Sequence, residues 1–180
     1  DGTGGPEALG FIGREWKRKG LRLVIQVFRR LLKKNPRLRL VVAGVDSEEL
    51  KPLAAGLESQ LDVMGWVQNK ESFYQKVSMV IHPARLEAFG MVVTEALVRD
   101  IPVLVSDQVG AASEIKEGKG RVLPLTSSIS EWVNAAEELL KQHRTNTTTY
   151  KRSWDQVALD YQGLYTRILA GEQASASDVG

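Results

Sequence analysis

Residues 8–34 read ALGFIGREWKRKGLRLVIQVFRRLLKK, and this stretch decides the fold class. Its first five residues are a short apolar run, which is typical of a buried strand. From Leu21 to Lys34 the apolar residues recur with the period of a helix and lie on one face. A strand, a loop and an amphipathic helix in this order predict the first part of a βαβ unit.

The rest of the chain repeats this alternation. Short apolar runs predict strands at 38–43, 63–65, 77–82, 103–106 and 121–123. Segments with helical periodicity predict helices at 47–59, 71–77, 91–99, 129–140 and 154–169. Strands that alternate with helices indicate an α/β fold built on a parallel sheet.

Length and composition predict one globular domain, because 43% of the 180 residues are apolar and 26% are charged. We expect a flexible leader at 1–6, the domain at 7–170 and a disordered tail at 171–180. The absence of cysteine excludes disulfide scaffolds, Cys-ligated zinc and thiol catalysis. No apolar run approaches the roughly 20 residues of a transmembrane helix, and residues 1–15 lack a signal-peptide pattern. The expected location is the cytoplasm.

Positive charge gathers early in the chain, since the first 40 residues include 11 basic and 3 acidic ones. Several basic residues, from Arg29 to Arg39, mark the end of the first predicted helix, and the simplest interpretation is a solvated helix end. The alternative is a patch that meets anionic lipid, which would hold the protein peripherally at the inner face of the plasma membrane. Nucleic acid is not an expected partner, because the basic residues are not interleaved with aromatic ones.

The first loop that suggests chemistry follows strand 8–12. In a parallel sheet, ligands bind outside the carboxyl ends of the strands, which is where this loop lies. It carries Gly13, Arg14 and Lys19 just before a helix. Cations and helix N-terminal amides together suit a phosphate group. The alternative is a solvated basic loop without a ligand.

A second loop, residues 83–90, precedes the helix at 91–99. Gly90 permits close backbone approach, and the free amides of Met91 and Val92 carry the positive end of the helix dipole. Glu95 lies one turn further, where its two acceptor oxygens match a vicinal diol such as a ribose. The alternative is that Glu87 and Glu95 are surface acids without a ligand.

A third loop, residues 106–114, has the pattern of a βα loop with a helix N-cap at Ser113.

His82 ends a predicted buried strand and is interpreted as a packed core histidine. The sequence contains no Walker loop, no GxGxxG, no HExxH and no Asp-x-Asp pair, so no metal site is indicated.

These motifs, in this order and spacing, resemble the nucleotide-sugar-binding half of the retaining GT-B glycosyltransferases of family four. The resemblance rests on Gly13-Arg14-x4-Lys19-Gly20, Glu87-x7-Glu95 with Phe89-Gly90, Ile101-Pro102-Val103, and the segment from Gly110 to Glu114. The last predicted helix also resembles the closing helix of that family. The implied fold is a Rossmann-like three-layer αβα parallel sheet, the C-terminal half of a GT-B enzyme.

The resemblance assigns roles to individual residues. Arg14 and Lys19 would hold the donor diphosphate and stabilise the leaving group, while Glu87 would contact hydroxyls of the donor sugar; these three are the predicted catalytic residues. Glu95 would accept hydrogen bonds from the ribose. The remaining predicted substrate-binding residues lie beside the phosphates, the sugar or the base: Gly13, Trp66, Val67, Phe89, Gly90, Met91 and Val92. For Trp66, a core aromatic is the alternative.

The implied activity is transfer of a hexose from a UDP, GDP or ADP sugar to a glycan or lipid acceptor, without a metal cofactor. Residues 17–20 further resemble the lipopolysaccharide core glucosyltransferases, which suggests cell-envelope synthesis. The acceptor site would belong to an N-terminal domain that this chain lacks, so the chain alone is expected to be inactive. The alternative is a non-catalytic nucleotide-sugar-binding regulatory module. The family usually has glycine where Asp100 and Ala111 stand, and Ala111 is expected to narrow the sugar pocket.

Overall fold

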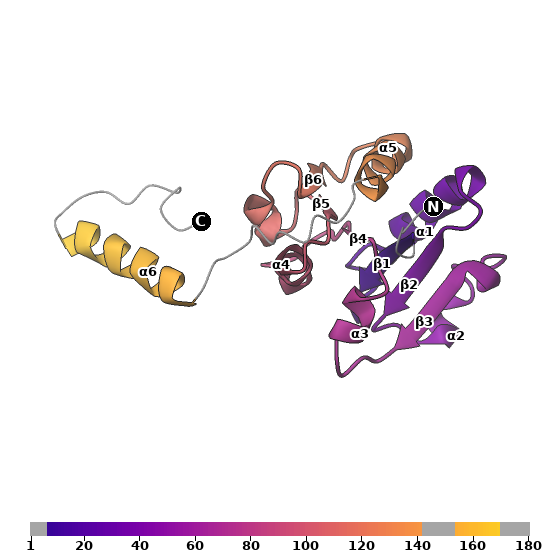
Figure 1. The fold of residues 1–180 in the computed structure, drawn as a ribbon, viewed down its shortest axis with the longest axis horizontal. Coiled ribbons are helices and arrows are strands. Elements are labelled where there is room, and N and C mark those ends of the chain that lie inside the picture. The colour runs from indigo at the N-terminus through magenta and orange to yellow at the C-terminus, as the bar shows by residue number, and fades with distance from the viewer. Residues whose placement is uncertain (1–6, 142–153, 170–180) are drawn as a thin grey trace, which may run out of the picture. The chain divides into compact units, whose positions relative to one another are not determined.

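The computed structural model describes residues 7–141 and 154–169 (Figure 1). The chain divides into two compact units, Asp1–Thr148 and Thr149–Gly180. The described part of the second unit is one helix, α6 (Trp154–Leu169). The first unit holds the sheet and all other helices of the described chain.

The sheet has six parallel strands, and each connection between consecutive strands contains an α-helix or a 3₁₀ turn. In chain order they are β1 (Ala8–Ile12), β2 (Arg39–Ala43), β3 (Leu61–Gly65), β4 (Met79–His82), β5 (Val103–Ser106) and β6 (Gly120–Leu123). Their order in the sheet is β3-β2-β1-β4-β5-β6. The chain therefore builds outward from β1 in one direction and then in the other, which leaves a topological switch point between β1 and β4. The predicted parallel α/β fold is confirmed.

Helices connect the strands. They are α1 (Leu21–Lys34), α2 (Ser47–Leu50), α3 (Glu71–Tyr74), α4 (Met91–Val98) and α5 (Ile129–Leu140), with 3₁₀ turns η1 (Glu58–Gln60) and η2 (Gly110–Glu114). In Figure 1, α1 and α5 lie on one side of the strands, and α3 and α4 lie on the other. This arrangement confirms the three-layer, Rossmann-like architecture.

The four inner strands, β2, β1, β4 and β5, are buried on both faces because helices cover both, whereas the edge strands β3 and β6 are partly exposed. Alternate strand residues such as Leu9 and Phe11 join the main core cluster together with Phe28 of α1 and Trp132 of α5. The intervening residues face the opposite layer. A Cβ at Gly10 of β1 would meet Phe73 and Val77 at 2.8 and 2.7 Å, so only glycine permits this close packing.

Two predicted helices are shorter than the sequence periodicity indicated. The helix predicted at 47–59 is α2, which ends at Leu50, because Pro52 disfavours continuation and Gly56 adopts a left-handed φ of 77°. The helix predicted at 71–77 ends at Tyr74. Strand β3 is longer than predicted and begins at Leu61.

Some sequence predictions lie outside the described residues. These are the leader at 1–6 and the tail at 171–180. The extent of the domain, 7–170, stays a prediction, since its last part falls in the second unit. Within the described ranges, no helix has the length and apolar character needed to span a membrane.

Candidate functional site

Backbone hydrogen bonds tie the three predicted loops together at the carboxyl ends of the strands. The amide of Arg85 donates to the carbonyl of Arg18 at 2.9 Å, which joins the second loop to the first. The amide of Glu87 donates to Gln108 at 3.0 Å, and that of Ala111 donates to Phe89 at 2.6 Å. The second loop is therefore held between the first and the third.

Glycines make this close approach possible. A Cβ at Gly20 would lie 2.1 Å from the carbonyl oxygen of Pro83, and one at Gly110 would lie 2.1 Å from that of Ala88. Gly20 also has a φ of 81°, a conformation that residues with a Cβ rarely adopt. Glycine at these two positions thus allows the loops to pack backbone against backbone.

A cavity of about 310 Å³ opens at this edge of the sheet. Its lining comes from the segments that follow β1, β2 and β3 and from the start of α4: Ile12, Gly13, Arg14, Glu15, Arg18, Lys19, Gly44, Trp66, Val67, Lys70 and Val92. This is the place where open parallel sheets bind ligands. Six predicted site residues are among the lining residues: Gly13, Arg14, Lys19, Trp66, Val67 and Val92.

Positive charge dominates the cavity lining. Four cationic side chains, those of Arg14, Arg18, Lys19 and Lys70, contribute to it, against the one carboxylate of Glu15. Three of these cations have a carboxylate neighbour: Arg18 pairs with Glu15 at 2.5 Å, Lys70 pairs with Glu95 at 2.7 Å, and Lys19 lies 3.4 Å from Glu87. Arg14 has no ion pair within the described chain, so the four cations outnumber these three carboxylates and the net charge at the cavity is positive. An anion is the ligand that this charge distribution favours.

Trp66 is a surface residue at the cavity and not a core aromatic, because 67% of it is exposed. The guanidinium carbon of Arg14 lies 5.0 Å from the centre of its ring, within cation–π range. The indole thus holds the guanidinium of Arg14 beside the cavity.

Glu87 does not line the cavity, but it lies close to two residues that do. Its Oε2 is 3.4 Å from Lys19 Nζ and 3.6 Å from Arg18 Nη1. Both distances are longer than a direct charged hydrogen bond, so the carboxylate is close to two cations without being saturated by them. Its exposed fraction is 16%, which leaves part of the side chain accessible.

His82 is fully buried at the end of β4, as predicted for a core histidine. Its Nε2 lies 3.7 Å from Glu87 Oε2, and within the described chain neither ring nitrogen has a hydrogen-bond partner. Burial, with a further contribution from Lys19, lowers the pKa of His82 to about 4. The imidazole is therefore neutral at pH 7 and adds no charge beside Glu87.

Glu95 is the fifth residue of α4, and its carboxylate contacts residues at α3. Its Oε1 accepts from Lys70 Nζ at 2.7 Å, and its Oε2 accepts from the hydroxyl of Tyr74 at 2.7 Å. Glu95 is not itself in the cavity lining, but Lys70 and Val92 beside it are. Lys70 and Tyr74 were not predicted from the sequence, and the available signal was weak: a tyrosine that follows an apolar residue such as Phe73 can be buried, and a buried tyrosine usually has a polar partner nearby.

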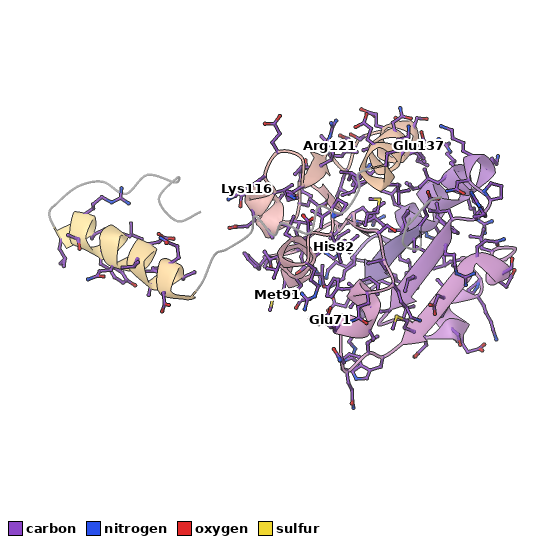
Figure 2. All side chains as sticks on the ribbon, viewed as in Figure 1. Glu71, His82, Met91, Lys116, Arg121 and Glu137 are labelled. Atoms are coloured by element: carbon purple, nitrogen blue, oxygen red, sulfur yellow. The ribbon has the colours of Figure 1, made fainter. Side chains whose placement is uncertain are left out.

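Three predicted site residues lie next to the cavity without lining it. Phe89 and Met91 are exposed, with Met91 on α4 (Figure 2), while Gly90 is the N-cap of α4 with a φ of 93°. The predicted N-cap at Ser113 is wrong: Ser113 lies inside η2 and its hydroxyl donates to the carbonyl of Gly110. Ala111 is fully buried and does not line this cavity, and its expected narrowing of the sugar pocket stays a prediction.

Several basic residues at the end of α1 have partners within the protein. Arg29 donates to the carbonyl of Ala55 at 2.7 Å, and Lys34 pairs with Glu137 at 2.6 Å. Arg39 donates to the carbonyls of Ser59 and Leu61. These contacts hold several of the basic side chains against the protein's own surface, whereas the sequence predicted a solvated helix end. In the part of the chain that the structure describes, no group of three or more His, Asp or Glu side chains could hold a metal ion.

Comparison with known proteins identifies a family. The model of the glycosyl transferases group 1 family matches residues 3–154. The capsular polysaccharide biosynthesis glycosyltransferase CapM of Staphylococcus aureus is 28% identical over 116 residues, 62% of this chain and 30% of CapM. The lipopolysaccharide core biosynthesis mannosyltransferase LpsB of Rhizobium meliloti is 31% identical over 119 residues, 61% of this chain and 34% of LpsB. The chain thus spans about a third of the length of these relatives.

Solved structures show the same fold. The C-terminal domain of the glycosyl transferase group 1 family protein LpcC from Francisella tularensis superposes with a TM-score of 0.65 at 22% identity. The match covers 87% of this chain and 87% of that domain. The sheet and its helices therefore share the fold of that domain.

Proposed function

The chain belongs to the glycosyl transferases group 1 family, and we propose that it is the donor-binding part of a retaining glycosyltransferase. The proposed reaction moves a hexose from a nucleoside diphosphate sugar to a glycan or lipid acceptor. The relatives act in capsular polysaccharide and lipopolysaccharide core synthesis, as their names state, which supports a role in cell-envelope synthesis. The acceptor site is proposed to lie in a separate N-terminal domain, so that the chain alone binds the donor without transferring the sugar.

The observation that carries this proposal is the cationic cavity at the switch point of a parallel sheet. Two unit charges 4 Å apart interact by about 4 kcal/mol at an effective dielectric near 20, before desolvation. Arg14 and Lys19, both in the lining, can place such charges on a diphosphate. In this proposal they bind the donor and stabilise the departing diphosphate, the task that a metal ion performs in other enzymes.

The neighbouring groups supply recognition of the rest of the donor. Trp66 is exposed beside the cavity and presents a face on which a base can stack. Glu95 is proposed to accept hydrogen bonds from the ribose, and Glu87 from hydroxyls of the donor sugar. The amides of Phe89, Gly90 and Met91 at the start of α4 would meet the sugar and the distal phosphate.

Ligand-dependent thermal unfolding of this chain tests the proposal. UDP, GDP and ADP are added separately, so that the size of each shift identifies the preferred base. Ligand at 100 times its dissociation constant stabilises a protein by about 2.7 kcal/mol, which for a chain of this size raises the midpoint by roughly 5–10 °C. We expect such a shift for at least one diphosphate and a smaller one for the corresponding monophosphate.

Matched variants locate the binding site. Arg14→Ala should abolish most of the shift, because this side chain lines the cavity. Lys17→Ala is the control: Lys17 lies on the same loop, and its ammonium is 5.4 Å from the Trp16 ring, outside the lining. No shift with any diphosphate, or an equal loss in both variants, would contradict a donor site in this cavity.

A further inference from the structure

Tyr74 is a buried polar residue next to the site, and it has no role in the proposal so far. It is the last residue of α3, and its exposed fraction is 1%. Its hydroxyl donates to Oε2 of Glu95 on α4 at 2.7 Å. The two residues are 21 positions apart in the chain, so this contact exists only because α3 and α4 pack on the same face of the sheet.

The surroundings of Tyr74 fix the ring and therefore the position of the hydroxyl. Phe73 meets it edge to face, with ring centres 5.2 Å apart. The guanidinium carbon of Arg99, the C-cap residue of α4, lies 4.7 Å from the centre of the Tyr74 ring. Arg99 is itself held, since its Nε donates to Glu71 at 2.8 Å and its Nη1 donates to the carbonyl of Glu95 at 2.7 Å; Figure 2 shows Glu71 on α3.

The two oxygens of the Glu95 carboxylate have partners of different character. Oε2 is bonded to the buried phenol, while Oε1 is bonded to Lys70, whose side chain is 46% exposed and long enough to move. Burial raises the pKa of Tyr74, and the neighbouring Glu95 adds to this effect, so the phenol remains a donor at any physiological pH. A carboxylate has about four acceptor sites, so lone pairs remain for further donors.

We propose that Tyr74 is a positioning residue: it anchors one oxygen of Glu95 so that the remaining lone pairs of the carboxylate face a ribose diol. This inference rests on the proposed function, because it assumes that the ligand is a nucleotide. Tyr74 does not itself touch the ligand. Without the phenol, the carboxylate can rotate toward Lys70 alone, and the geometry that matches two adjacent hydroxyls is lost.

The test uses Tyr74→Phe, which keeps the ring and removes only the hydroxyl. Dissociation constants are measured by calorimetry for UDP, GDP and ADP and for their 2′-deoxy counterparts. The informative quantity is the ratio of deoxy to ribo dissociation constants within one variant, because a lower folded fraction cancels from it. We expect a ratio of about ten in the unmodified chain, and a ratio at least about threefold smaller in Tyr74→Phe.

Two further variants separate positioning from a general structural effect. Tyr165→Phe removes a hydroxyl from an exposed tyrosine on α6 and should leave the ratio unchanged. In a Glu95→Ala background, adding Tyr74→Phe should change the ratio no further, because the tyrosine acts only through that carboxylate.

The outcomes distinguish this inference from the proposed function. If the unmodified chain binds none of the three diphosphates, the proposed function fails and the inference fails with it. If it binds a diphosphate but Tyr74→Phe keeps the full ratio, the donor site stands and the positioning role is overturned. A ratio near one in the unmodified chain would likewise overturn the role of Glu95 as the ribose acceptor.

Discussion

Asp100 has a positive φ of 56°, and among the described residues it is the only non-glycine residue of this kind. It follows the last turn of α4, where its amide donates to Leu97 and the amide of Ile101 donates to Ala96. These two bonds form a Schellman motif, in which the left-handed position is usually glycine. This left-handed conformation explains why the family usually has glycine at this position. In this chain Asp100 adopts it instead, and the ion pair between Lys119 and Asp100 Oδ1, at 2.6 Å, compensates for the conformational cost.

Substitutions at residue 100 should follow this conformational preference. Asp100→Gly removes the ion pair but also the strain, so we expect the free energy of unfolding to stay within about 1 kcal/mol of the unmodified chain. Asp100→Ala loses the ion pair and keeps a side chain in the left-handed region, so it should be less stable than the glycine variant by about 1 kcal/mol or more. Urea unfolding measures both, and equal stabilities of the two variants would contradict the explanation.

At the scale of elements, α5 depends on a capping box at its N-terminus. The hydroxyl of Ser128 accepts from the amide of Glu131, and the carboxylate of Glu131 accepts from the amide of Ser128 at 2.7 Å. Two amides at the start of the helix are thereby satisfied. Trp132 directly follows Glu131 and belongs to the main core cluster. Fraying of the first turn of α5 would therefore disturb the packing of this core.

The capping box makes part of the stability dependent on pH. The hydrogen bond from the Ser128 amide lowers the pKa of Glu131 below its ordinary value of 4.5. The ionised carboxylate therefore stabilises the folded state above pH 4.5, and this contribution disappears as the pH falls through the folded-state pKa. We expect Glu131→Gln to destabilise the chain at pH 7 and to have a smaller effect at pH 3, in chemical denaturation at both values.

A second glutamate on the same helix provides the control. Glu138 is exposed and has one ion pair in the described structure, to Arg121 at 3.5 Å, so Glu138→Gln should change stability little at either pH. Ser128→Ala should cost about 1 kcal/mol at pH 7, as removal of an N-cap generally does. An effect of Glu131→Gln that is the same at both pH values would refute the capping contribution.

At the scale of the whole molecule, the binding cavity is confined to one unit of the chain. Every residue that lines it lies between Ile12 and Val92. The strands and helices that support those residues end with α5 at Leu140. The cavity therefore requires the sheet unit, and nothing in its lining comes from the second unit.

Truncation tests this division. A chain that ends at Lys141 should fold and bind the same nucleoside diphosphate as the full chain, with a dissociation constant within about threefold, because its cavity lining is unchanged. Calorimetric titration of both chains gives the comparison. A large loss of affinity with intact folding would show that the predicted domain, 7–170, is one functional body.

Much of the site could be predicted because the fold is parallel. Gly13, Arg14 and Lys19 follow one strand, and Glu87 follows another. The carboxyl ends of parallel strands share an edge, so loops distant in the sequence were expected to meet there, and they do. Helix ends were predicted less well: the apolar period through residues 47–59 concealed the turn that Pro52 and Gly56 impose.

The alternation of strands and helices, the parallel sheet and the edge at which its loops gather could all be derived from the sequence. Periodicity, helix termini and the handedness of βαβ connections act through residues close in the chain, so they can be derived from local patterns. Three features became clear from the packed structure alone: Glu95 contacts Tyr74 and Lys70, His82 lies beside Glu87, and Trp66 is exposed. Such contacts depend on distances of a few ångströms between elements packed against each other, and local periodicity contains no information about them.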